Sequence, residues 1–231
     1  DRVGSHCFIL NQPVKSIALD DKQATVTLAD GRVLQGDDVI LTAPVSTWGQ
    51  IEFDPPLPAE LKPQMGINTK FLTHVKTRFW EEDNQSPRSF SDGVIPLTWE
   101  DTGNQPEEGG VCLTVYGGGP TAKQASDWPD PDRQPNYLAA LKALYPRIAA
   151  NFLAGKFINW PQDRWALGSY SFPAPGQVTT LGPILYEGLG RLHFAGEHCC
   201  YAFIGYMEGA LQSGGLLARR LAERDGLVKK K

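Results

Sequence analysis

The chain has 231 residues, of which 41% are hydrophobic and 10% aromatic, so it can bury a sizeable core in one or two domains. The formal net charge of −4 argues against a nucleic-acid surface, since the basic run at residues 229–231 stands at the chain's end. No apolar stretch approaches the ~20 residues of a membrane span and no signal peptide is visible, so we expect a soluble protein whose compartment, cytoplasmic or secreted, stays open.

The amino-terminal part predicts a series of short strands. Alternating apolar and polar residues indicate a β-meander with strands at residues 14–19, 24–28 and 33–35. Residues 39–44 then predict a buried strand that ends in Ala43 and Pro44. The prolines within residues 53–58 predict a stiff, extended connector to the middle of the chain.

The middle of the chain predicts further strands together with helices. Strands are expected up to Val75 and at residues 94–99 and 111–116. The stretch 126–135 is rich in Asp and Pro and predicts a loop. Helical pieces are expected at residues 136–144, where Asn136 is a suitable cap, and at residues 147–153.

Residues 193–210, HFAGEHCCYAFIGYMEGA, predict a buried strand, a Gly-Glu turn, an aromatic loop and a helix that opens at Gly205. At Gly196-Glu197 the backbone lacks side-chain bulk where the strand ends, so a ligand can approach it. The free amides at the helix start favour partial negative charge. By pattern alone, an ordinary strand-loop-helix unit that closes a core explains the same residues.

These residues resemble the C-terminal flavin-binding signature of the flavin-containing amine oxidases, the family of monoamine, polyamine and L-amino acid oxidases. The match consists of FAGE, then GYMEGA, then Gly214. The resemblance implies that FAD is bound by Gly196, Glu197, Gly205, Tyr206 and Met207. Amides at the helix start would stabilise the negative charge that reduction places near flavin N1.

Other matches follow in the family's order. The resemblance implies that Val14 offers its backbone to the adenine, that Ala43 and Pro44 lie close to the cofactor, and that Trp160 flanks the flavin. Residues 53–58 resemble the family's crossing between its two domains.

The resemblance also implies three catalytic residues. Lys70 matches the family's lysine that holds a water against flavin N5, and a buried cation there would assist reoxidation by dioxygen. Tyr170 and Tyr206 would form the two walls of an aromatic cage that orients the amine. Without the family, the lysine would be taken as a surface charge and the tyrosines as core or surface aromatics.

Ser169 stands where the mammalian monoamine oxidases have the cysteine that bonds to the flavin. A hydroxyl makes no such thioether, so noncovalent FAD is expected. The cysteines, Cys7, Cys112, Cys199 and Cys200, have neither C-x-x-C nor zinc-ligand spacing, and the histidines are scattered, so no metal site is expected.

The family's dinucleotide fingerprint, G-x-G-x-x-G after a strand, is missing from the sequence. The chain therefore resembles the C-terminal half of a two-domain FAD-dependent amine oxidase, of mixed α/β class, with a Rossmann-like FAD-binding domain and a mixed-sheet substrate domain. Residues 1–56 and 160–231 are assigned to the FAD-binding domain and residues 57–159 to the substrate-binding domain. A second polypeptide that carries the fingerprint is expected; a fragment of a longer chain is the other possibility.

The predicted function is FAD-dependent oxidation of an amine or L-amino acid to an imine, with dioxygen reduced to hydrogen peroxide. One alternative is a desaturase or dehydrogenase of the same FAD superfamily. Another is a noncatalytic fragment or subunit that needs another chain to bind FAD.

Overall fold

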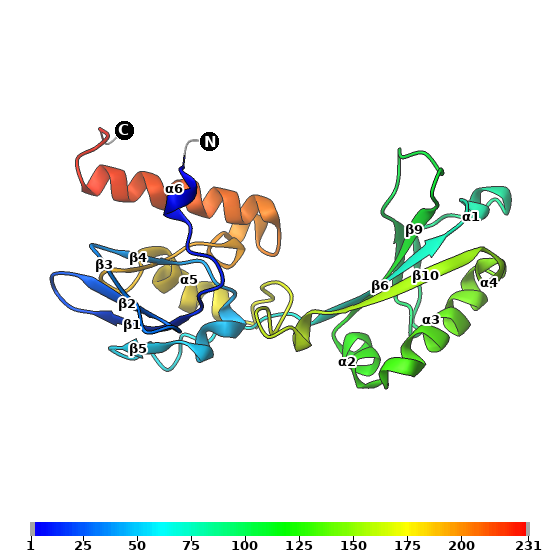
Figure 1. The fold of residues 1–231 in the computed structure, drawn as a ribbon, viewed down its shortest axis with the longest axis horizontal. Helices are drawn as coiled ribbons and strands as arrows, with labels where there is room; N and C mark the ends of the chain where they lie inside the picture. Colours follow the sequence, from blue (N-terminus) through cyan, green and yellow to red (C-terminus); the bar gives the residue numbers. More distant parts are fainter. Residues whose placement is uncertain (1–2, 230–231) are drawn as a thin grey trace. The chain divides into compact units, whose positions relative to one another are not determined.

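Figure 1 shows the computed structural model of the chain, which describes residues 3–229. Two residues of the C-terminal basic run, Lys230 and Lys231, lie outside the described residues. The chain divides into two compact units: the first ends at Met65 and resumes at Tyr170, and the second is formed by Gly66–Ser169. Each unit has its own hydrophobic core.

The first unit contains the predicted meander, which is confirmed. β1 (Val14–Leu19), β2 (Ala24–Leu28) and β3 (Val33–Gly36) pair in antiparallel fashion, and β5 (Glu52–Asp54) pairs parallel with β1. The turn before β3 lies at Asp30-Gly31, as its residues predict. Gly31 has φ +86°, and the Asp30 carboxylate accepts a hydrogen bond from the Arg32 amide.

A second, parallel pair of strands lies in the same unit. β4 (Val39–Leu41) pairs with β11 (Leu192–Phe194), and Leu41 stands opposite Phe194. α5 (Gln177–Glu187) shares a core with these strands, in which Trp48 stacks on Phe194 at 5.1 Å between ring centroids. The prediction that β4 is wholly buried is wrong, because Ile40 is 47% exposed. Within residues 3–229 no strand pairs with the other edge of β4.

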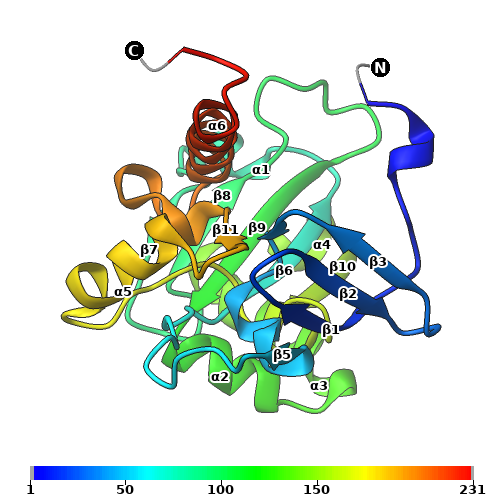
Figure 2. The ribbon, with the colours of Figure 1, turned by 90° about the vertical axis from the view of Figure 1, so that its left-hand side faces the viewer.

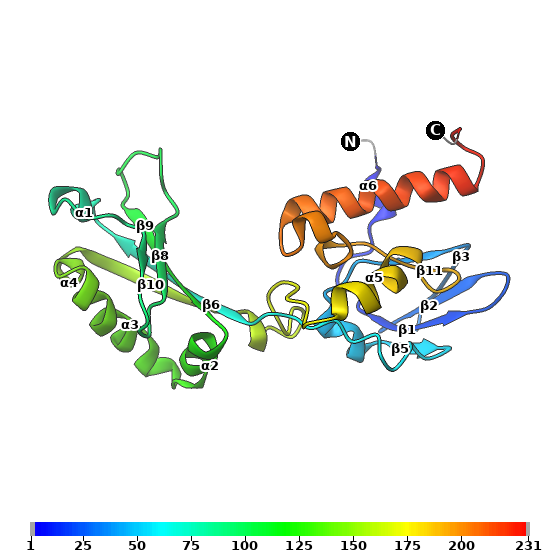
Figure 3. The ribbon, with the colours of Figure 1, turned by 180° about the vertical axis from the view of Figure 1, so that it is seen from behind.

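The long helix α6 (Met207–Arg224) packs against the parallel pair. Its start is tied to the end of β11 by Ser213, which bonds Gly196, and its end is tied to the start of β4 by the ion pair of Arg224 with Asp38. α6 therefore runs opposite to the two strands. Figure 2 looks nearly along α6, with the meander and α5 to either side beneath it, and Figure 3 shows the same helix from behind.

The second unit is an antiparallel sheet covered by helices. Its strands are β6 (Asn68–Val75), β7 (Ser89–Phe90), β8 (Leu97–Glu100), β9 (Val111–Gly118) and β10 (Phe152–Asn159), in the order β10-β6-β9-β8-β7. The helices are α1 (Phe79–Glu82), α2 (Pro120–Asp127), α3 (Asp130–Leu144) and α4 (Ile148–Asn151). Phe71 of β6 and Tyr137 of α3 stack at 4.7 Å, so α3 covers the face that carries the odd-numbered residues of β6.

Several predictions for this unit are wrong. The expected loop at residues 126–135 contains the end of α2 and the start of α3. Pro131 is tolerated in the first turn of α3, where amides have no intrahelical partner, and Pro135 is held inside the helix because Tyr137 and Leu141 are buried. The helix expected at 147–153 shortens to α4, since the chain enters β10 at Phe152, a strand that was not predicted.

Candidate functional site

Four of the predicted cofactor residues of the first unit follow the carboxyl ends of the parallel strands β4 and β11. β4 and β11 end in register, and the amide of Ala195 donates to the Leu41 carbonyl at 3.3 Å. Ala43-Pro44 and Gly196-Glu197 therefore follow two neighbouring carboxyl ends. Ligands of open α/β sheets bind at this edge. The structure therefore places these four predicted residues after the same end of the two strands.

The backbone at Gly196 requires glycine. Its φ is +147°, and a Cβ there would lie 2.5 Å from the ring of His198. Burial lowers the pKa of His198, although the neighbouring Glu197 charge acts in the other direction. The neutral ring packs edge-on against Trp48, with 5.6 Å between centroids. This packing supports the turn that carries Glu197.

The start of α6 differs from the prediction. The helix begins at Met207 and not at Gly205, because Gly205 has φ +81° and Tyr206 is extended. Tyr206 and Met207 are 70% and 87% exposed. Among residues 3–229 no side chain caps this helix, so its first amides are available to an acceptor on a ligand.

The Glu197 carboxylate is bonded to its own chain. One oxygen accepts hydrogen bonds from the amide and the hydroxyl of Ser171, both at 2.9 Å, and the other accepts from the Gly205 amide at 2.6 Å. These donors are the neighbours of Tyr170 and Tyr206. The predicted contact of Glu197 with FAD stays a prediction. Val14, the remaining predicted residue of this unit, begins β1 opposite Leu28 and is half-buried.

Lys70 and Trp160 lie in the second unit, at the same end of its sheet. Lys70 stands in β6 between Ile158 of β10 and Tyr116 of β9, and Trp160 follows the end of β10 and is 41% exposed. The Lys70 ammonium lies 5.4 Å from the centroid of the Trp99 ring. Lys70 is half-buried, whereas a buried cation was expected.

Sequence reasoning missed the aromatic neighbours of Lys70. The rings of Trp99 in β8 and Tyr116 in β9 lie 6.0 Å apart beside this lysine. Their strands were predicted from alternation, but the order of strands in the sheet is needed to bring them next to β6. Their π-faces attract a cation, so this sheet face suits a lysine or an amine.

Orphaned polar atoms surround the start of β6. In the part of the chain that the structure describes, the buried atoms Asn68 Oδ1, Asn159 Nδ2 and Ser169 Oγ have no hydrogen-bond partner. Asn159 stands opposite Thr69, and the Ser169 amide bonds the Gly66 carbonyl, so these atoms belong to one region. Buried polar groups without a partner indicate a missing water or ligand. In the first unit, the start of α6, which no side chain within residues 3–229 caps, separately fits a negatively charged or polar group such as FAD carries.

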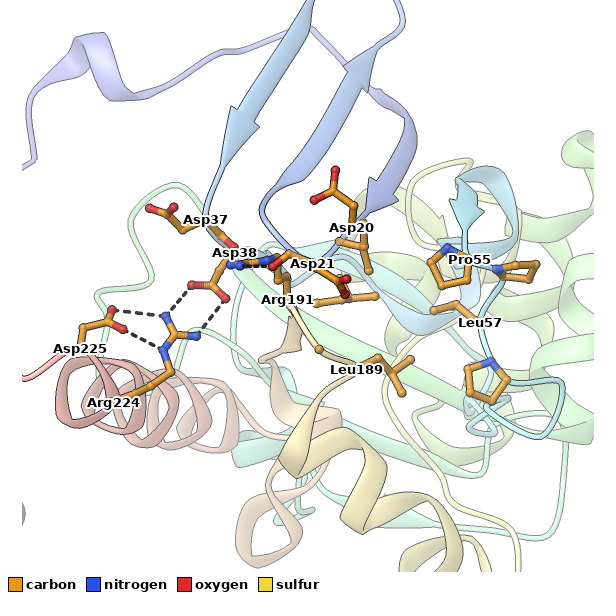
Figure 4. Close-up of a pocket in the computed structure, with 15 residues that line it drawn as sticks. Asp20, Asp21, Asp37, Asp38, Pro55, Leu57, Leu189, Arg191, Arg224 and Asp225 are labelled. Carbon is orange, nitrogen blue, oxygen red and sulfur yellow. Dashed lines mark hydrogen bonds and ion pairs between the residues drawn. The ribbon is translucent and has the colours of Figure 1, made fainter.

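A cavity of about 1050 Å³ opens elsewhere in the first unit, and Figure 4 shows its lining. Asp38 accepts hydrogen bonds from Arg224 and His193, and the Arg224 bond in particular lowers the pKa of Asp38 to about 2. Arg191 donates to the main-chain carbonyls of Asp37 and Asp21. These charged groups hold segments together, and none of the predicted site residues lines the cavity.

The adjacent cysteines near Glu197 are poor nucleophiles. Burial raises the pKa of Cys199 to about 12, and Cys200 is buried with its thiol hydrogen-bonded to Gln212.

No helix within residues 3–229 has the length and apolar character needed to cross a membrane.

The chain matches a family model and several known proteins. Residues 4–222 match the model described as flavin containing amine oxidoreductase. The chain is 28% identical to the probable flavin-containing monoamine oxidase A of Dictyostelium discoideum. The alignment has 239 positions and covers 96% of this chain and 50% of that protein. It is also 28% identical to the L-amino acid dehydrogenase of Synechocystis sp., over 93% of this chain and 46% of that protein.

Solved structures of amine oxidases have a similar fold. Cyclohexylamine oxidase from Brevibacterium oxydans superposes with a TM-score of 0.85 at 25% identity, over 96% of this chain and 50% of the other. A putrescine oxidase variant reaches a TM-score of 0.85 at 23% identity, over 94% of this chain and 49% of the other, which shows a shared fold. The chain spans about half the length of the curated relatives it matches.

Proposed function

The chain belongs to the flavin-containing amine oxidoreductase family, and from that membership we propose that it forms part of an FAD-dependent oxidase of amines or L-amino acids. The family and the mixed α/β fold class confirm the resemblance carried by FAGE and GYMEGA. The reaction would oxidise the C–N bond to an imine and pass the electrons to dioxygen, which yields hydrogen peroxide.

The observation that carries the proposal is the start of α6, which no side chain within residues 3–229 caps and which follows Gly205, whose amide donates to Glu197 just after β11. When bound, FAD supplies the acceptor for two electrons from substrate. The backbone amides at the start of α6, which no side chain within residues 3–229 caps, would stabilise negative charge on the reduced cofactor without reorganising. Val14, Ala43, Pro44 and Trp160 are the further proposed cofactor residues. The hydroxyl at Ser169 supports noncovalent binding.

Lys70, Tyr170 and Tyr206 are the proposed catalytic residues. The ammonium of Lys70 beside Trp99 supports a role in placing positive charge where oxygen is reduced. The exposed Tyr206 ring and the half-buried Tyr170 ring would orient an amine. We assign the first unit to FAD binding and the second to the substrate side.

Uncovered apolar surface on the first unit supports a further half of the enzyme, on a second polypeptide that carries the dinucleotide fingerprint. The buried stripe of α6 consists of Gly209, Ser213 and Leu217. Next to it the helix carries an exposed apolar stripe of Ala210, Leu211 and Ala218. Leu211 is 73% exposed, and no strand within residues 3–229 pairs with the outer edge of β4, although parallel strands are normally covered.

A dehydrogenase that uses another electron acceptor is the second candidate, favoured by the relative named L-amino acid dehydrogenase. A desaturase of the FAD superfamily and a noncatalytic subunit are the remaining alternatives.

The first experiment combines an intact-mass measurement with the visible spectrum of the purified protein. The spectrum is recorded without oxygen before and after addition of amines and of L-amino acids, and then after air is admitted. Flavin bands that one substrate class bleaches, and that air restores with formation of peroxide, would support the oxidase. Bands that stay bleached in air would favour the dehydrogenase, and a colourless preparation of this chain with its second half would refute flavin binding.

Lys70→Met tests the assigned lysine. Oxidation of reduced flavin by oxygen should slow by about a hundredfold or more, the scale of removing one preorganised charge, while reduction by substrate changes little. Lys156→Met is the matched control, because Lys156 is an exposed lysine on the neighbouring strand β10. Equal effects of Lys70→Met on both half-reactions would contradict the role.

A further inference from the structure

The Glu197 carboxylate joins two segments that are far apart in the chain. Its Oε1 accepts from the Ser171 amide at 2.9 Å, and its Oε2 accepts from the Gly205 amide at 2.6 Å. Each donor amide is adjacent to one of the two cage tyrosines, Tyr170 and Tyr206. We name these hydrogen bonds, together with the one from the Ser171 hydroxyl, the carboxylate clip.

The two joined segments are also in close contact. A Cβ built on Gly205 would lie 3.5 Å from the ring of Tyr170, and Gly205 has φ +81°. The Tyr170 ring therefore stands against the bare backbone that precedes Tyr206. A side chain at Gly205 would be strained by the positive φ, and its Cβ would be in van der Waals contact with this ring.

The two sides of the clip are anchored unequally. Ser171 is held independently of Glu197 by a β-bridge with Met65. The amide of the next residue, Phe172, donates a hydrogen bond to the Gln64 carbonyl, and the Gln64 side chain donates one to the Phe172 carbonyl. For Gly205, the Glu197 carboxylate is the partner that the structure records for its amide. The clip thus ties the loop before α6 to a segment that has further bonds of its own.

A carboxylate is suited to this task. Ionised, it only accepts hydrogen bonds, and it can do so at both oxygens, so one side chain can hold two amides that point toward each other. Bonds from an amide to a charged oxygen are shorter and about twice as strong as neutral ones. No neutral side chain of similar length reproduces two pure acceptors.

We propose that Glu197 is a positioning residue that sets the separation of Tyr170 and Tyr206, and through it the fit of the substrate amine between the two rings. This inference rests on the proposed function, in which the tyrosines form the substrate cage. The carboxylate acts through the backbone at Ser171 and Gly205. It need not touch the reacting atoms.

Glu197→Gln tests the clip, because Gln keeps one acceptor oxygen in place of two and cannot accept from both Ser171 and Gly205. Hydrogen exchange of the intact protein should become about tenfold or more faster at whichever of these two amides loses its acceptor, the effect of losing one charge-assisted hydrogen bond, and stay unchanged in β11. The KM for the amine should rise by about tenfold while the flavin spectrum and flavin content persist. Glu187→Gln, at the exposed end of α5, makes the same change in charge and should alter neither quantity.

Three outcomes would overturn the proposal. Unchanged exchange at both the Ser171 and the Gly205 amide would show that the clip does not hold the loop. Faster exchange with an unchanged KM would remove its role in the cage, and loss of flavin from the variant would make Glu197 a cofactor ligand. A wild-type enzyme that oxidises no amine would instead refute the proposed function, and with it the cage, while the exchange experiment still judges the clip itself.

Discussion

Replacement of Asp38 by Asn should destabilise the first unit at neutral pH and have almost no effect near pH 2. Asp38 stands just before β4 and accepts hydrogen bonds from Arg224 at the end of α6, at 2.6 and 3.0 Å. It accepts another from His193 in β11 at 3.0 Å. One carboxylate therefore joins three segments that are distant in the sequence, and Figure 4 shows its pairing with Arg224.

The size of the effect follows from the pKa of Asp38. The hydrogen bond from Arg224 is the largest cause that lowers this pKa from 3.8 to about 2, against the opposing effect of burial. Complete conversion of that shift corresponds to about 2.5 kcal/mol. The Arg224 side chain is 46% exposed, so solvent screening reduces the expected loss to about 1 kcal/mol. Because the pKa of Asp38 is lower in the folded state, its contribution is complete above pH ~4 and is lost as the pH falls through about 2.

Hydrogen exchange resolved to peptides of β11 and α6 measures the stability of the first unit alone. Exchange in wild type and Asp38→Asn is compared at pH 7 and pH 3, after correction for the intrinsic rates. The variant should exchange about fivefold faster at pH 7, and the difference should shrink at pH 3. Asp225→Asn is the control, because Asp225 also pairs with Arg224 but is 47% exposed, so it should cost under ~0.5 kcal/mol. An equal difference at both pH values, or an equal effect of the control, would refute the reasoning.

Two further predictions concern packing around the α6 start. Gly209→Ala places a Cβ 2.2 Å from the Phe203 carbonyl oxygen and should lower the free energy of unfolding by about 2 kcal/mol, whereas Gly215→Ala, in open space on the same helix, should raise it by ~0.5–1 kcal/mol. Thermal unfolding checks both, and shifts of the same sign would contradict the packing. Burial lowers the pKa of His198, so the unfolded state binds a proton that the folded state does not, and stability should fall as the pH drops below ~6.5. His198→Gln should flatten that fall in urea unfolding measured from pH 7 to 5, and parallel curves would show that His198 does not cause it.

Local pattern was sufficient where one short segment contains the whole signal. The meander follows from alternation and from the turn at Asp30-Gly31, and β11 follows from an apolar run that ends in Gly196-Glu197. Pattern failed for α3, because prolines that predict a loop are outweighed by burial of Tyr137 against Phe71. It also missed β10, whose residues become a strand because β6 offers an edge.

The sequence by itself determined the family, since motif residues and their order suffice for that, and it identified Lys70, Tyr170 and Glu197 as residues of interest. The tertiary structure decided what these residues contact. Only the parallel register of β4 and β11 places Ala43 and Gly196 after the same end of the two strands, and only the sheet order places Trp99 beside Lys70. The bonds of Glu197 with Ser171 and Gly205 depend on the folding of segments that are up to 26 residues apart, and a linear pattern contains no information on such distances.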